Sequence, residues 1–283
     1  MALRSPPHCD TGGAVQKVIA AFDRVNLVGL GERHWSREDS EFRLKVIRAP
    51  EFSKRVNDIV IEFGNPLYQE VLDRYINGED VAHSELSKVW ELTTQGKSSV
   101  WRAPIYEELI ATVRDVNRVL PQNRRLRIIA GDYPADESYF QKMRAVDRDG
   151  AAANVIQKEV LDKKHKALVI FGAVHLLRTE PQRIVGLLRT DPRASWFIVA
   201  SAGGPGLPAV FASHSATLAN PTLIPTTGEV GKVYAGYLML DTKGRWDQTP
   251  GRALIGPMID ACLYFGSEEP QVVPTSGTDV RRE

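Results

Sequence analysis

Four apolar runs in the sequence end beside a glycine and an ionisable side chain. These are LVGLGERH, with Glu32 and His34, IVIEFG, with Glu62, LVIFGAVH, with His175, and IIAGDYP, with Asp132. A carboxylate beside an imidazole supports two kinds of chemistry. It can fix the tautomer of a histidine that acts as a general base on water, or it can complete a set of metal ligands. The residue types alone leave both possibilities open.

Glu32 and His34 are separated by a single residue. In extended backbone, residues two apart project from the same face, so these side chains can share one ligand or one proton while Arg33 points away. Gathering several ionisable groups in one buried place costs several kcal/mol of free energy and is rarely maintained without a partner or a task. We therefore predict that this pair joins Glu62 and His175 in one functional site.

Two further side chains are candidates for binding substrate at this site. Arg148, in DRDGAAANV, stands at the start of a predicted helix that leads into the His175 strand. It can be a solvated residue at a helix end, or a donor to an anionic group or transition state. Asp132 ends its own apolar run as Glu62 does. His165, within the charged run DKKHK, has a weaker claim to a functional role.

The elements that must position these side chains follow from five short apolar runs rich in β-branched residues. The runs span residues 26–30, 58–63, 126–130, 167–171 and 196–200. Longer segments with helical periodicity separate them, which predicts an α/β fold with a mostly parallel central sheet flanked by helices. Ligands of such sheets bind outside the carboxyl ends of the strands, so we expect the candidate residues to converge there.

The segments between the runs are predicted to be helical at residues 37–48, 66–77, 104–120 and 147–164. Ser36, followed three residues later by Asp39, is a capping box for the first of them. Two later apolar runs, 233–240 and 261–265, add candidate strands. Their short connections favour antiparallel pairing, so the predicted sheet is mixed.

We predict a single domain over residues 1–266. Within it, residues 78–103 carry Trp90 and Trp101 but little strand character, and we expect a helical excursion that forms one wall of the site. Residues 201–231 are rich in Gly, Pro, Ser and Thr and form either a lid or a plain surface loop. Residues 267–283 are polar and are predicted to be a flexible tail.

Composition narrows the classes of partner. The chain has 283 residues, 36 Lys and Arg against 35 Asp and Glu, and a net charge of +1, which gives no overall field to attract nucleic acid. No run approaches the ~18 apolar residues of a membrane span. Cys9 and Cys262 form no disulfide framework. We expect a cytoplasmic protein, unless a signal peptide was removed before residue 1.

The order of these motifs resembles that of the erythromycin esterase-like proteins, which belong with the haem-binding ChaN lipoproteins and the Tiki/TraB proteases in one broad superfamily. The motifs are G-E-x-H after the first strand, a glutamate closing the second, RLRIIAGDYP, and RDGAAANV leading to ALVIFGAVHLLR. The resemblance runs from about residue 25 to residue 178. It returns at IDACLYFG, residues 259–266, which is similar to the closing strand of that family.

The resemblance implies a role for each candidate residue. His34 would be the base that activates water, and Glu32 and Glu62 would orient or assist it. His175 would complete the site, and Arg148 would match a site arginine. One departure concerns GERH, which has one residue between Glu and His where the esterases typically have two. That spacing is closer to the haem- and metal-binding branches.

Three functions therefore compete. The first is a hydrolase that activates water with His34 and acts on an ester or a related acyl substrate. A serine mechanism is disfavoured because the sequence has no G-x-S-x-G elbow. The second is a protein that binds haem or a transition metal through the same residues without turnover. The third is a Tiki-like metal-dependent protease. The cofactor is accordingly none, haem or a divalent metal, and the partner is a small-molecule substrate or haem.

Overall fold

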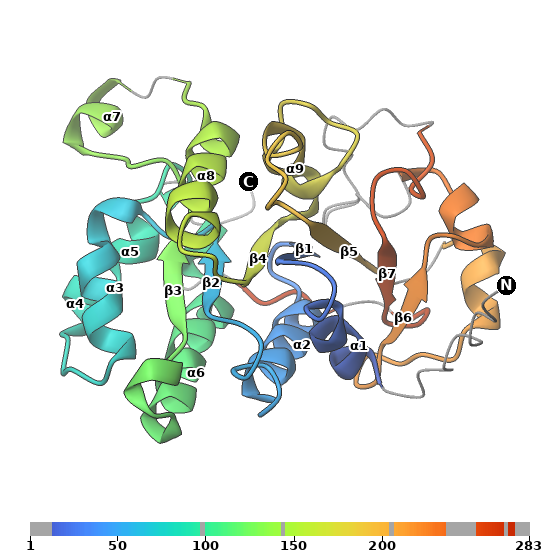
Figure 1. Ribbon diagram of the computed structural model, residues 1–283, viewed down its shortest axis with the longest axis horizontal. Helices are drawn as coiled ribbons and strands as arrows, with labels where there is room; N and C mark the ends of the chain where they lie inside the picture. The colour runs from blue at the N-terminus through green and yellow to red at the C-terminus, as the bar shows by residue number, and fades with distance from the viewer. Residues whose placement is uncertain are drawn as a thin grey trace, which may run out of the picture.

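A seven-stranded sheet organises the residues that the computed structural model describes, which are 13–96, 100–142, 145–203, 207–235, 253–268 and 271–274. The strands are β1 (Leu27–Glu32), β2 (Asp58–Ile61), β3 (Arg127–Ala130), β4 (Ala167–Gly172), β5 (Trp196–Ala202), β6 (Thr222–Pro225) and β7 (Ala261–Tyr264). Their order in the sheet is β3-β2-β4-β1-β5-β7-β6, and only β6 runs antiparallel to its neighbour (Figure 1). The predicted α/β fold with a mostly parallel, mixed sheet is confirmed.

The antiparallel strand lies at a different place from the one predicted. Strand β6, residues 222–225, falls within the segment 201–231 that the sequence assigned to a loop, and it pairs with β7. Of the predicted strand 233–240, residues 233–235 hold only an isolated bridge between Tyr234 and Leu254. Residues 236–240 lie outside the described residues.

Helices cover both faces of the sheet (Figure 1). The α-helices are α1 (Ala14–Ala21), α2 (Arg37–Arg48), α3 (Gln69–Ile76), α4 (His83–Leu86), α5 (Lys88–Glu91), α6 (Pro104–Val119), α7 (Glu137–Lys142), α8 (Arg148–Ile156) and α9 (Ile184–Leu187). A π-helix, η5 (Gln157–Leu161), continues α8, and short 3₁₀ turns include η1 (Pro66–Tyr68), η3 (Val100–Arg102) and η6 (Ala173–Leu176). All four predicted helices are present, and Ser36 caps α2 by accepting a hydrogen bond from the Asp39 amide.

The core is split by the sheet because alternate strand residues face opposite sides. On β4, Leu168 and Ile170 pack with the helices α1, α2, α3 and α6, whereas Val169 and Phe171 pack with α8 and α9. Both faces of the central strands are therefore apolar, as expected for a parallel sheet covered on both sides. The excursion over residues 78–103 contributes α4, α5 and η3 to the first of these two layers.

Strand register brings the carboxyl ends of four strands level with one another. Glu32 at the end of β1 lies opposite Gly172 at the end of β4, and Ile61 on β2 lies opposite both Ile170 and Ala130. The polar residues that follow these strands therefore emerge side by side at one edge of the sheet, here called the carboxyl edge.

Residues 271–274 lie beside the turn that follows β1. Val272 forms an antiparallel bridge with Ser36, and the Val273 amide donates to the Trp35 carbonyl at 2.8 Å. Trp35 has a φ of 65°, in the left-handed region that a bulky side chain seldom adopts. These four residues belong to the predicted tail, and residues 269–270 and 275–283 of that tail lie outside the described residues.

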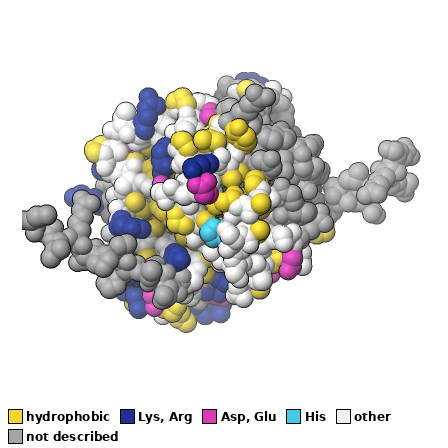
Figure 2. Space-filling view, turned by 90° about the vertical axis from the view of Figure 1, so that its right-hand side faces the viewer, with side chains coloured by type: hydrophobic (Ala, Val, Ile, Leu, Met, Phe, Trp, Pro, Cys, Tyr) yellow, Lys and Arg dark blue, Asp and Glu magenta, His cyan; other side chains and the backbone are white. Residues whose placement is uncertain are grey.

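Two surface properties bear on possible partners. Among the described residues, no helix has both the length and the apolar character that crossing a bilayer requires. On the face formed by the β6 and β7 end of the molecule, basic and acidic side chains are scattered among apolar and neutral ones (Figure 2).

Candidate active site

Glu32, the last residue of β1, anchors the first carboxylate–imidazole pair. Its Oε1 lies 2.7 Å from Nδ1 of His34 and accepts a hydrogen bond from the Tyr106 hydroxyl at 3.2 Å. Its other oxygen pairs with the buried guanidinium of Arg43 on α2. Glu32 is thus buried with its charge balanced, whereas the His34 side chain is 30% exposed.

Of the two ring nitrogens of His34, Nδ1 contacts Glu32, and Nε2 forms no hydrogen bond with the described residues. Because the Glu32 carboxylate accepts at Nδ1, we assign the proton of the neutral ring to Nδ1, which leaves Nε2 as an acceptor. Burial lowers the pKa of His34; Arg148 acts in the same direction, against the attraction of Glu62. The Trp101 ring meets the imidazole edge-to-face, with ring centroids 5.0 Å apart. A neutral imidazole with an open Nε2 is the form that a general base requires.

Glu62, directly after β2, lies at the centre of the cluster. Its Oε2 accepts from the Gly172 amide at 2.7 Å, and its Oε1 accepts from Nη2 of Arg148 at 2.9 Å and lies 3.4 Å from Nε2 of His175. Burial alone would raise the pKa of Glu62, but His175 and His34 in their protonated forms, the Arg148 guanidinium and the Gly172 amide outweigh it and hold the pKa at about 2. Glu62 is therefore a buried, ionised carboxylate at neutral pH.

A second carboxylate–imidazole pair flanks Glu62. Nδ1 of His175, on the turn η6, lies 2.9 Å from Oδ1 of Asp149 on α8. The other oxygen of Asp149 accepts from Nη1 of Arg183 at 3.1 Å. The two ring nitrogens of His175 thus face two different carboxylates, Asp149 and Glu62, which distinguishes this ring from that of His34.

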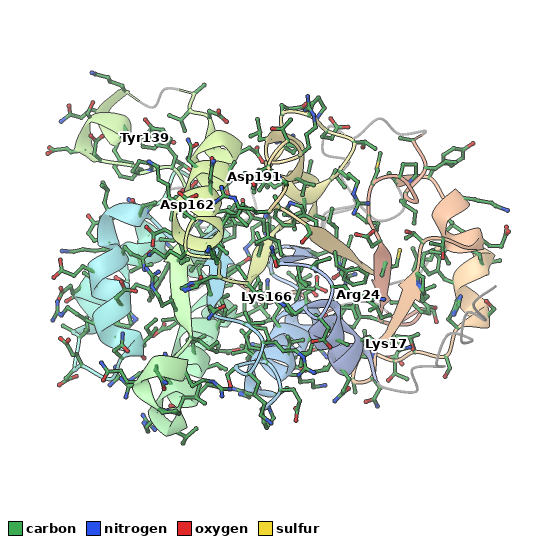
Figure 3. The ribbon with its side chains drawn as sticks, in the orientation of Figure 1. Lys17, Arg24, Tyr139, Asp162, Lys166 and Asp191 are labelled. Atoms are coloured by element: carbon green, nitrogen blue, oxygen red, sulfur yellow. The ribbon has the colours of Figure 1, made fainter. Side chains whose placement is uncertain are left out.

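Arg148 joins Glu62 to Asp132. Its Nε donates to Asp132 at 2.8 Å while Nη2 donates to Glu62, and the flanking carboxylates raise its pKa although burial acts to lower it. Asp132 also accepts from the amide and the hydroxyl of Thr94, at 2.7 and 2.9 Å, which ties the excursion to the sheet edge. Tyr139 of α7, labelled in Figure 3, donates to the Thr94 carbonyl at 3.1 Å.

Gly172 leaves space for the side chains of His34 and Glu62, which both lie close to it. A β-carbon at this position would lie 3.2 Å from Nε2 of His34 and 3.4 Å from Oε2 of Glu62. Gly31 serves the same edge, because a β-carbon there would lie 2.9 Å from the backbone of Ala173 in the turn that carries His175. Gly172 at the end of β4 and Gly31, one residue before the end of β1, therefore allow the close packing of the cluster.

The structure places all six predicted site residues in one cluster at the carboxyl edge. They are Glu32, His34, Glu62, Asp132, Arg148 and His175. Their roles in chemistry stay a prediction. The side chain of Arg33 turns away from them, as expected, toward Asp39 and the ring of Phe265.

Three contributors were not identified from the sequence. Arg43 lies on the α2 face that it shares with Val46 and Ile47, so helical periodicity marked it as buried and a buried arginine indicates a partner. Tyr106 lies in the same way on the buried face of α6. Asp149 directly follows Arg148, and its place beside a candidate site arginine was the only signal available.

A metal ion fits this cluster poorly. Glu62 and Asp132 already share the guanidinium of Arg148, so a cation bound to either acid would lie beside a fixed positive charge. Among the residues described, no group of three or more His, Cys, Asp or Glu side chains is arranged to hold a metal ion. We therefore derive no catalytic step through a metal.

Comparison with known proteins identifies similar structures but no similar sequences. A point mutant of erythromycin esterase EreC in its open conformation aligns with a TM-score of 0.61, at 11% identity, over 93% of this chain and 95% of that one. A Bacillus cereus protein aligns with a TM-score of 0.59, at 11% identity, over 92% and 93% of the two chains. A succinoglycan biosynthesis protein gives a TM-score of 0.53, at 10% identity, over 92% of each chain.

No protein-family model and no curated protein matches the sequence. At identities of 10–11%, the structural likeness establishes a common fold and does not extend to activity. The chain therefore has the fold of the erythromycin esterase EreC structure, in agreement with the resemblance of its motifs.

Proposed function

We propose that this protein is a hydrolase in which His34 activates water for attack on an ester or a related acyl substrate. The observation that carries the proposal is the contact between Glu32 and His34, at 2.7 Å, in a ring whose pKa is lowered. Together these features favour a neutral imidazole with Nδ1 protonated and Nε2 available to accept a proton. The fold shared with an erythromycin esterase supports the proposal by analogy only.

In the proposed reaction, a water molecule transfers a proton to Nε2 of His34 as its oxygen attacks the acyl carbon. Negative charge develops on the carbonyl oxygen. Arg148 is suited to stabilise this charge, because its side chain is 18% exposed and its Nη1 makes no hydrogen bond to the described residues. The proton on His34 then passes to the alkoxide as the carbon–oxygen bond breaks, which leaves a carboxylic acid, an alcohol and a neutral imidazole.

The supporting residues have separate tasks in this scheme. Glu32, paired with Arg43, orients His34 and stabilises the imidazolium that forms during the reaction. Glu62 provides a fixed negative charge beside Nε2 that favours transfer of the proton to the ring. His175 and Arg148 hold Glu62 in place from two further directions.

A panel of p-nitrophenyl acyl esters and simple lactones tests the proposal, with His34→Gln as the variant. His165→Gln is the matched control, because His165 also pairs with a buried carboxylate, Asp58, at 2.8 Å. We expect His34→Gln to lower kcat/KM by about 10²- to 10⁴-fold, the usual contribution of a general base. Equal activity of the two variants would remove His34 from the role of base.

The binding alternatives are separated by two measurements on the purified protein. A Soret band in the visible spectrum indicates haem, and stoichiometric metal by elemental analysis indicates a metal-dependent enzyme. Either result, combined with an absence of ester hydrolysis, would replace the proposed function.

A further inference from the structure

We propose that Asp149 and Arg183 are positioning residues that hold His175 against Glu62 in one fixed ring orientation. The inference rests on the proposed function for its effect on activity, but its structural content concerns only the imidazole. Neither residue was a candidate from the sequence, and neither has a part in the reaction proposed above.

The contacts of Asp149 make it an acceptor for His175. Its Oδ1 lies 2.9 Å from Nδ1 of the ring, and its Oδ2 accepts from Nη1 of Arg183 at 3.1 Å. Asp149 is buried, so solvent competes little for these oxygens. A carboxylate whose second oxygen is held by a guanidinium keeps its negative charge toward the ring and places a proton on Nδ1.

His175 is carried by a shorter element than its partner Asp149. It lies in η6, a short 3₁₀ turn after β4. Asp149 lies instead on α8, which Asp147 caps by accepting from the Gly150 amide at 2.8 Å and which packs into the core through Ala152 and Ile156. The rigid helix therefore orients a side chain carried by a turn.

The orientation matters because it decides what faces Glu62. With Nδ1 held by Asp149, Nε2 lies 3.4 Å from Oε1 of Glu62 and can donate to it when the ring carries a second proton. A ring flip would present a carbon to Glu62 instead. The charged groups around the ring are Asp149 and Arg148 from α8, Glu62 after β2, and Arg183 before α9. The two carboxylates face the ring, and an arginine pairs with each of them on its far side.

Three variants separate positioning from general structural support. Asp149→Asn keeps the shape of the side chain and removes its charge. Arg183→Gln removes only the ion pair on the far oxygen, and Arg183→Lys retains the charge. The matched control is Arg193→Gln, because Arg193 also bridges acids, Asp191 at 2.7 Å and Asp162 at 2.8 Å, without a contact to the described site residues.

The main readout is the ¹⁵N NMR spectrum of labelled histidine, with the His175 signals assigned by their loss in His175→Gln. In the wild type we expect Nδ1 to carry the proton. In Asp149→Asn we expect mixed tautomers, with kcat/KM about 10- to 100-fold lower. Arg183→Gln should have a smaller effect, about three- to tenfold, which Arg183→Lys restores. Arg193→Gln should leave both quantities unchanged.

The NMR result is independent of turnover, so the two proposals fail separately. His175 signals that are the same in Asp149→Asn as in the wild type would overturn the positioning role, whatever the activity. If Asp149→Asn alters the His175 signals but the wild-type protein hydrolyses no ester, the positioning role is upheld and the proposed function is rejected. If Asp149→Asn does not fold, Arg183→Gln decides, because unchanged His175 signals in that variant would also overturn the inference.

Discussion

Asp58 and His165 form a carboxylate–imidazole pair at the amino edge of the sheet, as Glu32 and His34 do at the carboxyl edge. The closest contacts are alike, 2.8 Å and 2.7 Å, and the two imidazoles are exposed to the same degree, 31% and 30%. Lys166, labelled in Figure 3, follows His165 and directly precedes β4. His165 therefore lies at the amino end of that strand. The two pairs differ in what surrounds them.

At the amino edge, burial raises the pKa of Asp58 even though His165 lowers it, and one oxygen of Asp58 has no hydrogen-bond partner among the described residues. At the carboxyl edge, the cations and imidazoles around Glu62 hold its pKa at about 2. A carboxylate beside an imidazole can thus arise at either end of a strand. Convergence of charged groups from several strands and helices is what distinguishes the candidate site.

The largest effect should come from neutralising Glu62, the buried acid at the carboxyl edge. Glu62→Gln should lower kcat/KM by about 100-fold or more, because Arg148 and both imidazoles lose their common anion. It should also lower the free energy of unfolding at pH 7 by on the order of 3 kcal/mol, from a pKa of about 2 against an ordinary value of 4.5. Steady-state kinetics and urea unfolding measure these effects.

Asp58→Asn is the counterpart at the amino edge. Because burial already favours the uncharged form of Asp58, we expect the free energy of unfolding to change by less than about 1 kcal/mol and activity to be retained.

The pH dependence of the free energy of unfolding should also differ in sign between Glu62 and Asp58. The stability from Glu62 is present above pH 4.5 and is lost as the pH falls toward about 2, whereas the contribution of Asp58 decreases as the pH rises through its raised pKa. A large loss of activity in Asp58→Asn would contradict the comparison.

Gly172→Ala should have an intermediate effect. The added methyl group would lie 3.2 Å from His34, so the ring must move by a few tenths of an ångström. We expect kcat/KM to fall by about tenfold, since misplacement of a catalytic group on this scale reduces rate strongly. Gly228→Ala is the control, because a β-carbon there meets no atom within 4 Å. Equal activity of the two variants would show that the close approach at Gly172 is not needed.

The fold and most of the site could be predicted from local patterns in the sequence. The apolar runs located β1 to β5, and the Ser36–Asp39 cap located the start of α2. Glu32 and His34 could be paired because spacing along an extended strand fixes which side chains share a face. The polar strand ends of a parallel sheet converge, which gathered Glu62 and His175 with them.

The features that the sequence did not predict depend on contacts between distant segments. Strand β6 was not recognised because Thr222–Pro225 is short and its pairing partner β7 lies nearly forty residues away along the chain. Asp149 was not recognised because the choice between solvent and a buried histidine depends on how α8 packs beside η6. Neither outcome is encoded in the neighbouring residues.

The smallest effect should come from removing residues 271–274, which contact the turn next to His34. Among the described residues, no equivalent segment lies at the amino edge. A chain ending at Pro274 keeps the hydrogen bonds of Gln271 and Val273 to Arg37 and Trp35, whereas a chain ending at residue 268 loses them. We expect the shorter chain to show kcat/KM about three- to fivefold lower than the longer one, because the strained turn at Trp35 is released. Equal activity of the two truncated chains would show that this contact does not position His34.

The pH dependence of kcat/KM for ester hydrolysis, combined with an NMR titration of His34, tests the central claim most directly. Because the pKa of His34 is lowered from 6.5, we expect activity to be full at neutral pH and to fall on the acid side along a one-proton curve with its midpoint below 6.5. That midpoint should coincide with the titration of His34 and stay unchanged in His165→Gln. A midpoint that follows another group, or an acid limb that persists in His34→Gln, would contradict the assignment of His34 as the base.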